Sequence, residues 1–145
     1  MSSISQTNHW IVFALGSAFF ASLTTVFGKL GVSEINSNLA TLIRTMVILV
    51  MVFGIVAVRN EWQPLDKISP FGFSMLMFSA IATGLSWLCY YRALQLGQAS
   101  NVAPIDKLSV VFVIAFSVLF LGEALTWKTV LGGLLVVCGA IVLAL

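Results

Sequence analysis

Three ionisable side chains lie within long apolar stretches of the sequence. Asp106 and Lys107 stand side by side in SNVAPIDKLSVVF, and Arg44 stands in LIRTMVILV. Inside a membrane, groups of this kind handle substrates or protons, hold helices together, or reach out to the interface as anchors. A cation without an acidic partner has to find carbonyls, hydroxyls, water or an anionic ligand group. Which chemistry applies depends on the segments that position these three residues.

The composition makes the chain a membrane protein. Hydrophobic residues make up 60% of the sequence and charged residues 8%, and the mean hydropathy is +1.09. Soluble domains contain about 25% charged residues. A chain of 145 residues is too short to bury this much apolar surface in a core of its own. The sequence therefore predicts an all-α integral membrane protein with lipid as its solvent.

Five segments have the length that a membrane crossing requires, which is about 20 mostly apolar residues. The predicted spans cover residues 10–28, 36–58, 69–91, 99–121 and 126–145. The second and the fourth reach this length only if they include Arg44 and the Asp106–Lys107 pair, respectively. We expect Pro104 in the first turn of the fourth span and Thr126 as the cap of the fifth.

The predicted spans place Arg44 and Asp106 at matching depth. Spans two and four enter from the same face, and each residue lies seven or eight positions in, or about 10 to 12 Å down. Neighbours on a helix point about 100° apart, so we expect Asp106 to pair with Arg44 and not with Lys107. Lys107 is then a surplus positive charge. Three hypotheses remain open for these residues: interfacial anchoring, a structural pair between the spans, and direct handling of substrate or protons.

Small polar residues follow helical stripes on two spans. Ser79, Thr83, Ser86 and Tyr90 share one face of span three, and Thr24 belongs to a similar stripe on span one. Such stripes either allow close helix packing or line a central cavity, which Trp87 and Tyr90 would border as an aromatic wall. Gly132 and Gly139, seven residues apart on span five, predict a helix-packing seam.

Several functional classes find no support in the sequence. It shows no Ser–His–Asp set, no metal-ligand cluster and no phosphate-binding glycine loop, so we expect no enzyme, no cofactor and no metal. Nucleic acid is excluded as a partner by the absence of a basic patch. Lys and Arg in the loops divide three to two between the two membrane faces, a weak bias that favours an N-terminus inside and leaves insertion in both orientations open.

Residues 90–145 contain four motifs in a fixed order: Ala93 and Leu94 after an aromatic pair, the ASNVAP stretch, the FLGE stretch at 120–123 and a glycine-rich last helix. With these motifs the segment resembles the second half of an EamA-type unit of the drug/metabolite transporter superfamily. Arg44 is placed like the arginine of the family's second helix. Many members have a proline near Val110, where this chain has LSVVF, so no kink is expected there.

The resemblance implies a fold and a function. Most members contain two five-helix units as inverted repeats around a midplane site, whereas this chain contains one. It would form half of a ten-helix fold completed by dimerisation, as a parallel or antiparallel homodimer. The implied function is a secondary transporter of a small-molecule substrate, working by alternating access as a multi-pass protein of the bacterial inner membrane. The alternatives are a non-transporting scaffold or regulatory subunit, and a lipid-headgroup flippase.

Overall fold

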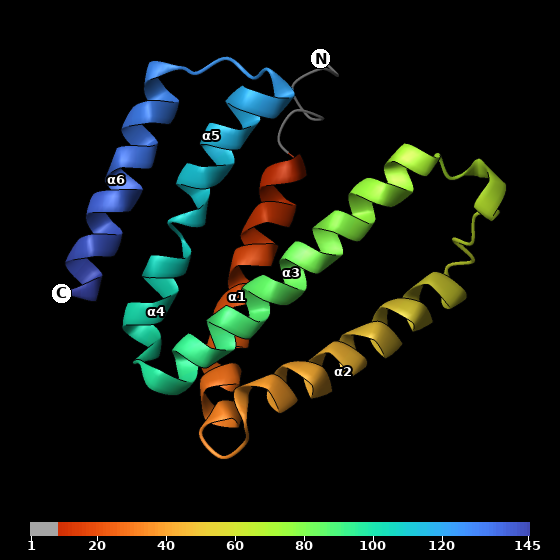
Figure 1. Ribbon diagram of the computed structural model, residues 1–145, viewed down its shortest axis with the longest axis horizontal. Coiled ribbons are helices and arrows are strands. Elements are labelled where there is room, and N and C mark those ends of the chain that lie inside the picture. Colours follow the sequence, from red (N-terminus) through yellow and green to blue (C-terminus); the bar gives the residue numbers. More distant parts are fainter. Residues whose placement is uncertain (1–8) are drawn as a thin grey trace. The chain divides into compact units, whose positions relative to one another are not determined.

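A computed structural model describes residues 9–145 and shows helices joined by short turns (Figure 1). The elements are α1 (His9–Val32), α2 (Ser37–Val58), the short 3-10 helix η1 (Leu65–Lys67), α3 (Pro70–Leu96), α4 (Ala99–Asp106), α5 (Ser109–Leu121) and α6 (Trp127–Ala144). This part of the chain contains no strand. With α4 and α5 taken as one crossing, five helical segments are long and apolar enough to span a membrane. The prediction of an all-α, five-helix membrane unit is confirmed.

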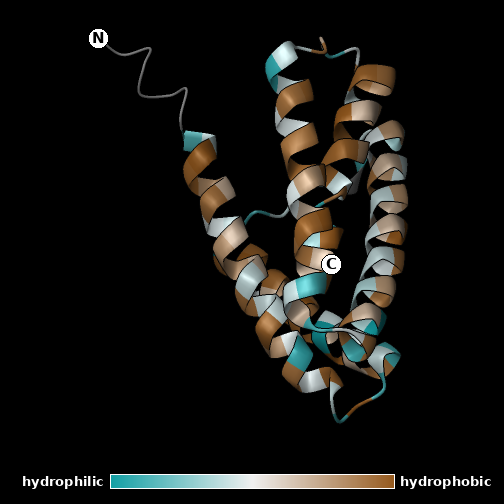
Figure 2. Ribbon diagram, turned by 90° about the vertical axis from the view of Figure 1, so that its left-hand side faces the viewer, coloured by the Kyte–Doolittle hydropathy of each residue, from teal (hydrophilic) through white to brown (hydrophobic). Residues whose placement is uncertain are grey.

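Hydrophobic residues recur along the full length of the helices (Figure 2), and many large apolar side chains are exposed. Phe13 on α1 is 79% exposed, Val50 on α2 68% and Leu119 on α5 72%. A helix that is apolar all round is buried or spans a membrane, and a helix also satisfies its own backbone hydrogen bonds in lipid. The outward faces of these helices are therefore lipid or partner contacts.

Gly31–Gln95 form one compact unit, which contains α2 and α3. Its buried side chains gather where α2 begins and α3 ends: Val32, Ser37, Thr41, Tyr91 and Leu94. At the same end, Nε2 of Gln95 donates hydrogen bonds to the carbonyl oxygens of Val32 and Ile35, both at 3.2 Å. Figure 1 shows the two helices close together there and further apart toward η1. This packed end holds Arg44.

A second compact unit comprises α4, α5, α6 and most of α1. Helix α6 packs against both α4 and α5, and its buried residues are Gly133 and Ala140. A Cβ on Gly133 would lie 3.4 Å from Cδ1 of Ile114 on α5, whereas one on Gly132 or Gly139 would meet nothing within 4 Å. The packing seam inside this unit therefore uses Gly133, not the two glycines that the spacing singled out.

The ends of α5 and α6 follow from local capping chemistry. Gly122 ends α5 with a left-handed φ of 68°, a conformation that costs a glycine little. The backbone N–H of Glu123 then donates to the carbonyl of Ser117 at 3.2 Å. Oγ1 of Thr126 accepts the backbone N–H of Thr129 at 3.2 Å, which confirms the predicted cap of the last span.

The fourth span is broken, contrary to expectation. Pro104 is the sixth residue of α4 and not part of its first turn, and α4 ends at Asp106. Proline lacks the N–H that would bond to the preceding turn. Just beyond it, the amides of Leu108 and Val110 bond to carbonyls three residues back, each at 3.0 Å, so the backbone tightens before α5 resumes. The interruption needs no proline near Val110.

Candidate functional site

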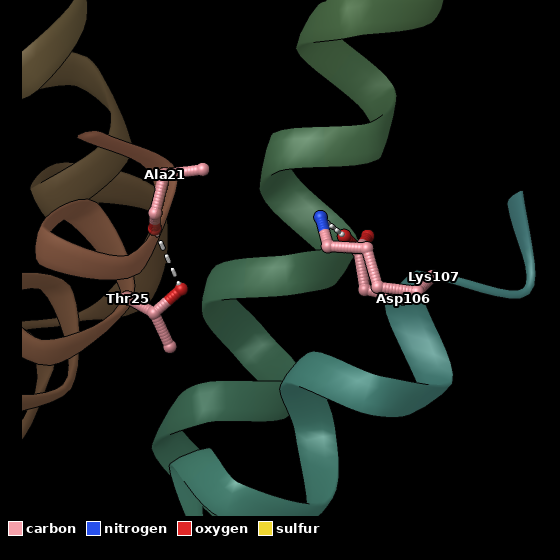
Figure 3. Close-up of polar contacts among 4 residues, drawn as sticks. All are labelled: Ala21, Thr25, Asp106 and Lys107. Atoms are coloured by element: carbon pink, nitrogen blue, oxygen red, sulfur yellow. Dashed lines mark hydrogen bonds and ion pairs between the residues drawn. The ribbon is translucent and has the colours of Figure 1, made fainter. Parts of the chain in front are cut away.

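Asp106 and Lys107 meet at this break. Nζ of Lys107 lies 3.2 Å from Oδ2 of Asp106, and Figure 3 shows the two side chains extending together from the end of α4. The expectation that these neighbours do not face each other was wrong. It assumed a continuous α-helix, but the backbone tightens at Lys107 and the long lysine side chain folds back. Lys107 is therefore a paired cation.

The Asp106–Lys107 pair sits beside an apolar groove. Lys107 lines a hollow of about 390 Å³ between α4 and α6, together with Ala103, Pro104, Leu135, Gly139 and Leu143 among others. The relative exposure of the side chains is 59% for Lys107 and 36% for Asp106. Two opposite charges at a helix break inside a span can take part in ion or proton handling or can hold the break in place.

The hydroxyls on the predicted stripe of α1 are only partly available to a ligand. Thr24 is half-buried on this helix. The hydroxyl of its neighbour Thr25 donates to the carbonyl of Ala21 at 3.0 Å (Figure 3). One turn further on, Nζ of Lys29 donates to the carbonyl of Gly97 at 2.7 Å. The Thr25 contact lies within α1, whereas the Lys29 contact joins α1 to the turn that precedes α4.

Arg44 lies against two aromatic rings of α3. Its guanidinium carbon is 4.1 Å from the ring centroid of Trp87 and 4.8 Å from that of Tyr91. A guanidinium over an aromatic face is attracted by the ring quadrupole. Trp87 was expected to form an aromatic wall with Tyr90. The second ring that contacts Arg44 is instead that of Tyr91. The i, i+4 spacing of Trp87 and Tyr91 is the signal that could have found this pair.

One polar atom of Arg44 stands out. Nη1 is buried and has no hydrogen-bond partner among the residues that the structure describes. A buried donor without a partner costs about 1–3 kcal/mol, and more when it is charged. The site thus contains a cation held between aromatic faces with donor capacity left over.

A pocket of about 380 Å³ adjoins this cluster between α2 and α3. Its lining residues are Thr41, Thr45, Leu76, Ser79, Ala80, Thr83, Gly84 and Trp87. The structure therefore brings together the predicted Ser79, Thr83 and Trp87. Ser86 is exposed, and Tyr90 packs its ring edge-on against Tyr91, with 6.2 Å between the centroids. Thr41 and Thr45 were missed, although their i, i+4 spacing around Arg44 marks one face of α2.

The hydroxyls of this pocket are largely used as donors within their own helices. Thr41 donates to the carbonyl of Ser37 at 2.9 Å, and Thr45 to that of Thr41 at 2.7 Å. On the other wall, Thr83 donates to the carbonyl of Ser79 at 2.9 Å. A hydroxyl oxygen that has given its hydrogen still accepts hydrogen bonds. The pocket therefore presents acceptors next to a cationic donor.

The predicted pairing of Asp106 with Arg44 stays a prediction. Each residue has close contacts within its own compact unit: Asp106 with Lys107, and Arg44 with its two rings. Arg44 lies seven residues after the first residue of α2, and Asp106 lies seven after the first residue of α4. The equal positions that motivated the pairing are therefore present in the two helices.

Comparison with known proteins assigns the family. The model of the EamA-like transporter family matches residues 8–145. The chain is 52% identical over 139 residues to an uncharacterized transporter in the cobO 3' region of Sinorhizobium sp, covering 96% of this chain and 99% of that one. It is 30% identical over 131 residues to the uncharacterized transporter YvbV of Bacillus subtilis (strain 168), covering 88% of this chain but 42% of YvbV. No solved structure matches. The chain, a multi-pass membrane protein, belongs to the EamA-like transporter family.

Proposed function

We propose that this chain is half of a small-molecule secondary transporter of the bacterial inner membrane and that a second copy completes it. The observation that carries the proposal is the five-helix unit itself. The Sinorhizobium transporter is matched over 99% of its length by such a unit, whereas YvbV is matched over 42%. A pair of copies would supply the two repeats between which secondary transporters place their binding site and alternate its access.

The residues proposed for the substrate pathway fall into two groups. The first group consists of Arg44, Trp87 and the hydroxyls of Ser79 and Thr83. The second group consists of Asp106 and Lys107. Ser86, Tyr90 and Thr24 complete the proposed pathway. Secondary transporters commonly build their sites from discontinuous helices, and a tightened stretch within a helix often marks a hinge, which supports the α4–α5 break as the proposed moving element.

Flux measurements test the proposed transport. The purified chain in liposomes should move at least one member of a metabolite library with saturable kinetics, and protein-free liposomes should not. A scaffold or regulatory subunit would give no flux and would copurify with a different protein. Movement restricted to labelled lipids would indicate a flippase and contradict the proposal.

Two adjacent glycines of α6 test the proposed homodimer. Gly132→Leu adds its side chain to open space, so the monomer should keep its melting temperature while the dimer dissociates at lower dilution. Gly133→Leu is the matched control, because its side chain would press on Ile114 and destabilise the fold by about 1–3 kcal/mol. Sedimentation and thermal unfolding in detergent distinguish the two effects. A Gly132→Leu dimer as tight as the parent's, or full flux from a monomer, would contradict this interface.

A further inference from the structure

The charges of α2 and α3 are all positive. Neither helix contains an acidic residue, and each contains one arginine, Arg44 and Arg92. Nη1 of Arg92 donates to Oε1 of Gln95 at 2.6 Å, so this arginine has an acceptor on its own helix. Nη1 of Arg44 has none within the described part of the chain. Of the two arginines in these helices, Arg44 is therefore the one with a donor available to an anion.

The aromatic rings do not provide a hydrogen-bond acceptor for this donor. Trp87 and Tyr91 hold the guanidinium by their faces, at 4.1 and 4.8 Å, but a ring face does not replace the oxygen acceptors that guanidinium N–H groups need. They restrict where the planar group lies, which reduces the entropy that a ligand must remove on binding. A planar, fixed guanidinium matches the two oxygens of a carboxylate through parallel hydrogen bonds.

We propose that Arg44, held by Trp87 and Tyr91, binds the anionic group of the transported molecule, and that the substrate is an organic carboxylate with a small apolar body. This inference rests on the proposed function, because it names the substrate class of the same pathway. The membrane makes the contact stronger than it would be in water, since the local dielectric constant is low.

The neighbouring pocket determines the size and polarity of the part of the substrate that lies beyond its carboxylate. Its volume of about 380 Å³ falls in the range of small-molecule sites, and Trp87 belongs to both the pocket and the arginine cluster. Thr41, Thr45 and Thr83 direct their hydroxyl hydrogens to their own helices, so the walls do not offer these donors to a second anionic group. A molecule with one carboxylate and an apolar or donor-bearing body fits this arrangement better than a dicarboxylate does.

Benzoate is a suitable probe. Trp10, Trp62 and Trp127 are replaced by Phe in the full chain, which leaves Trp87 as the remaining one of its four tryptophans and as a local reporter. Titrated into this protein in detergent, benzoate should change the fluorescence of Trp87 in a saturable way. Benzamide and benzylamine, which have the same ring with a neutral or a cationic group, should bind at least about tenfold more weakly.

Substitutions at Arg44 show whether this side chain is responsible. Arg44→Gln should weaken benzoate binding by about a hundredfold, and Arg44→Lys, which keeps the charge but loses the planar fork, by about tenfold. Arg92→Gln removes a charge from the same pair of helices and should leave benzoate affinity unchanged. If Arg44→Gln does not fold, the benzoate affinities of Arg44→Lys and Arg92→Gln are compared instead. The inference then requires that Arg44→Lys binds benzoate about tenfold more weakly than Arg92→Gln does.

Three results of the benzoate titrations alone would overturn the inference. They are equal affinity for benzoate and benzamide, equal weakening by Arg92→Gln and the Arg44 variants, and benzoate binding that appears only after Asp106→Asn. The last would mean that the carboxylate of Asp106 occupies Arg44. Saturable flux of a neutral metabolite without benzoate binding would overturn this inference and leave the transporter in place. Benzoate binding without any flux would support the site and contradict transport.

Discussion

Asp106→Asn should lower the free energy of unfolding by about 2 kcal/mol and reduce transport strongly. The change removes the carboxylate 3.2 Å from Nζ of Lys107 and leaves this ammonium beside an apolar groove at a helix break. An isolated lysine within a span costs roughly 2.5–3.5 kcal/mol on insertion scales, although a long side chain recovers part of it by reaching the interface. Thermal unfolding in detergent should show a fall of several degrees, about 2–4 °C for each kcal/mol in a chain of this size.

A double-mutant cycle identifies the partner of Asp106. Combining Asp106→Asn with Lys107→Gln should restore most of the lost stability, because no charge is then left unpaired, while transport stays low if the pair handles substrate or protons. The same cycle with Asp106→Leu and Arg44→Met tests the predicted Arg44–Asp106 pair. A single Asp106→Asn protein as stable and active as the parent would show that neither contact matters.

Trp87→Leu should cost about 2 kcal/mol of stability and impair transport. The indole lies under the Arg44 guanidinium at 4.1 Å and also forms part of the pocket wall. Its loss removes a cation–π contact worth roughly 0.5–2 kcal/mol together with apolar packing. Arg44 would then be a half-buried cation with one ring, that of Tyr91, in place of two. Thermal unfolding and liposome flux of the variant measure both effects.

Two variants serve as controls for this result. Trp87→Phe keeps a ring face at the same position and should recover most of the stability. Trp127→Leu removes a tryptophan that is 75% exposed at the start of α6, so its effect on unfolding should stay within about 0.5 kcal/mol. If Trp127→Leu destabilised the protein as much as Trp87→Leu, the loss would reflect tryptophan removal in general and not the contact with Arg44.

The local sequence was enough to indicate the family, but it was not enough to identify the residues of the candidate site. The FLGE stretch was identified by resemblance, and the structure gives it a local cause: Gly122 takes a left-handed φ of 68° that ends α5. Tyr91, by contrast, differs from its neighbour Tyr90 by 100° of helical rotation; its i, i+4 spacing places it on one face with Trp87, but the spacing does not say that this face meets Arg44. Only the packing of α3 on α2 makes that choice.

The sequence by itself determined that the protein has five apolar helices, that the second and fourth carry charge, and that Thr126 begins the last one. Hydrophobic length and capping are properties of neighbouring residues, so they can be read along the chain. The structure added two local features of the fourth span, the break at Lys107 and the contact of Asp106 with this lysine, which arise from the backbone that follows Pro104. Tertiary packing alone decided that Gly133 is the packed glycine and that Thr41 and Thr45 face Ser79 and Thr83 across a pocket. Helical spacing indicates which side chains share a face, but the partner of each face depends on close packing between segments distant in sequence.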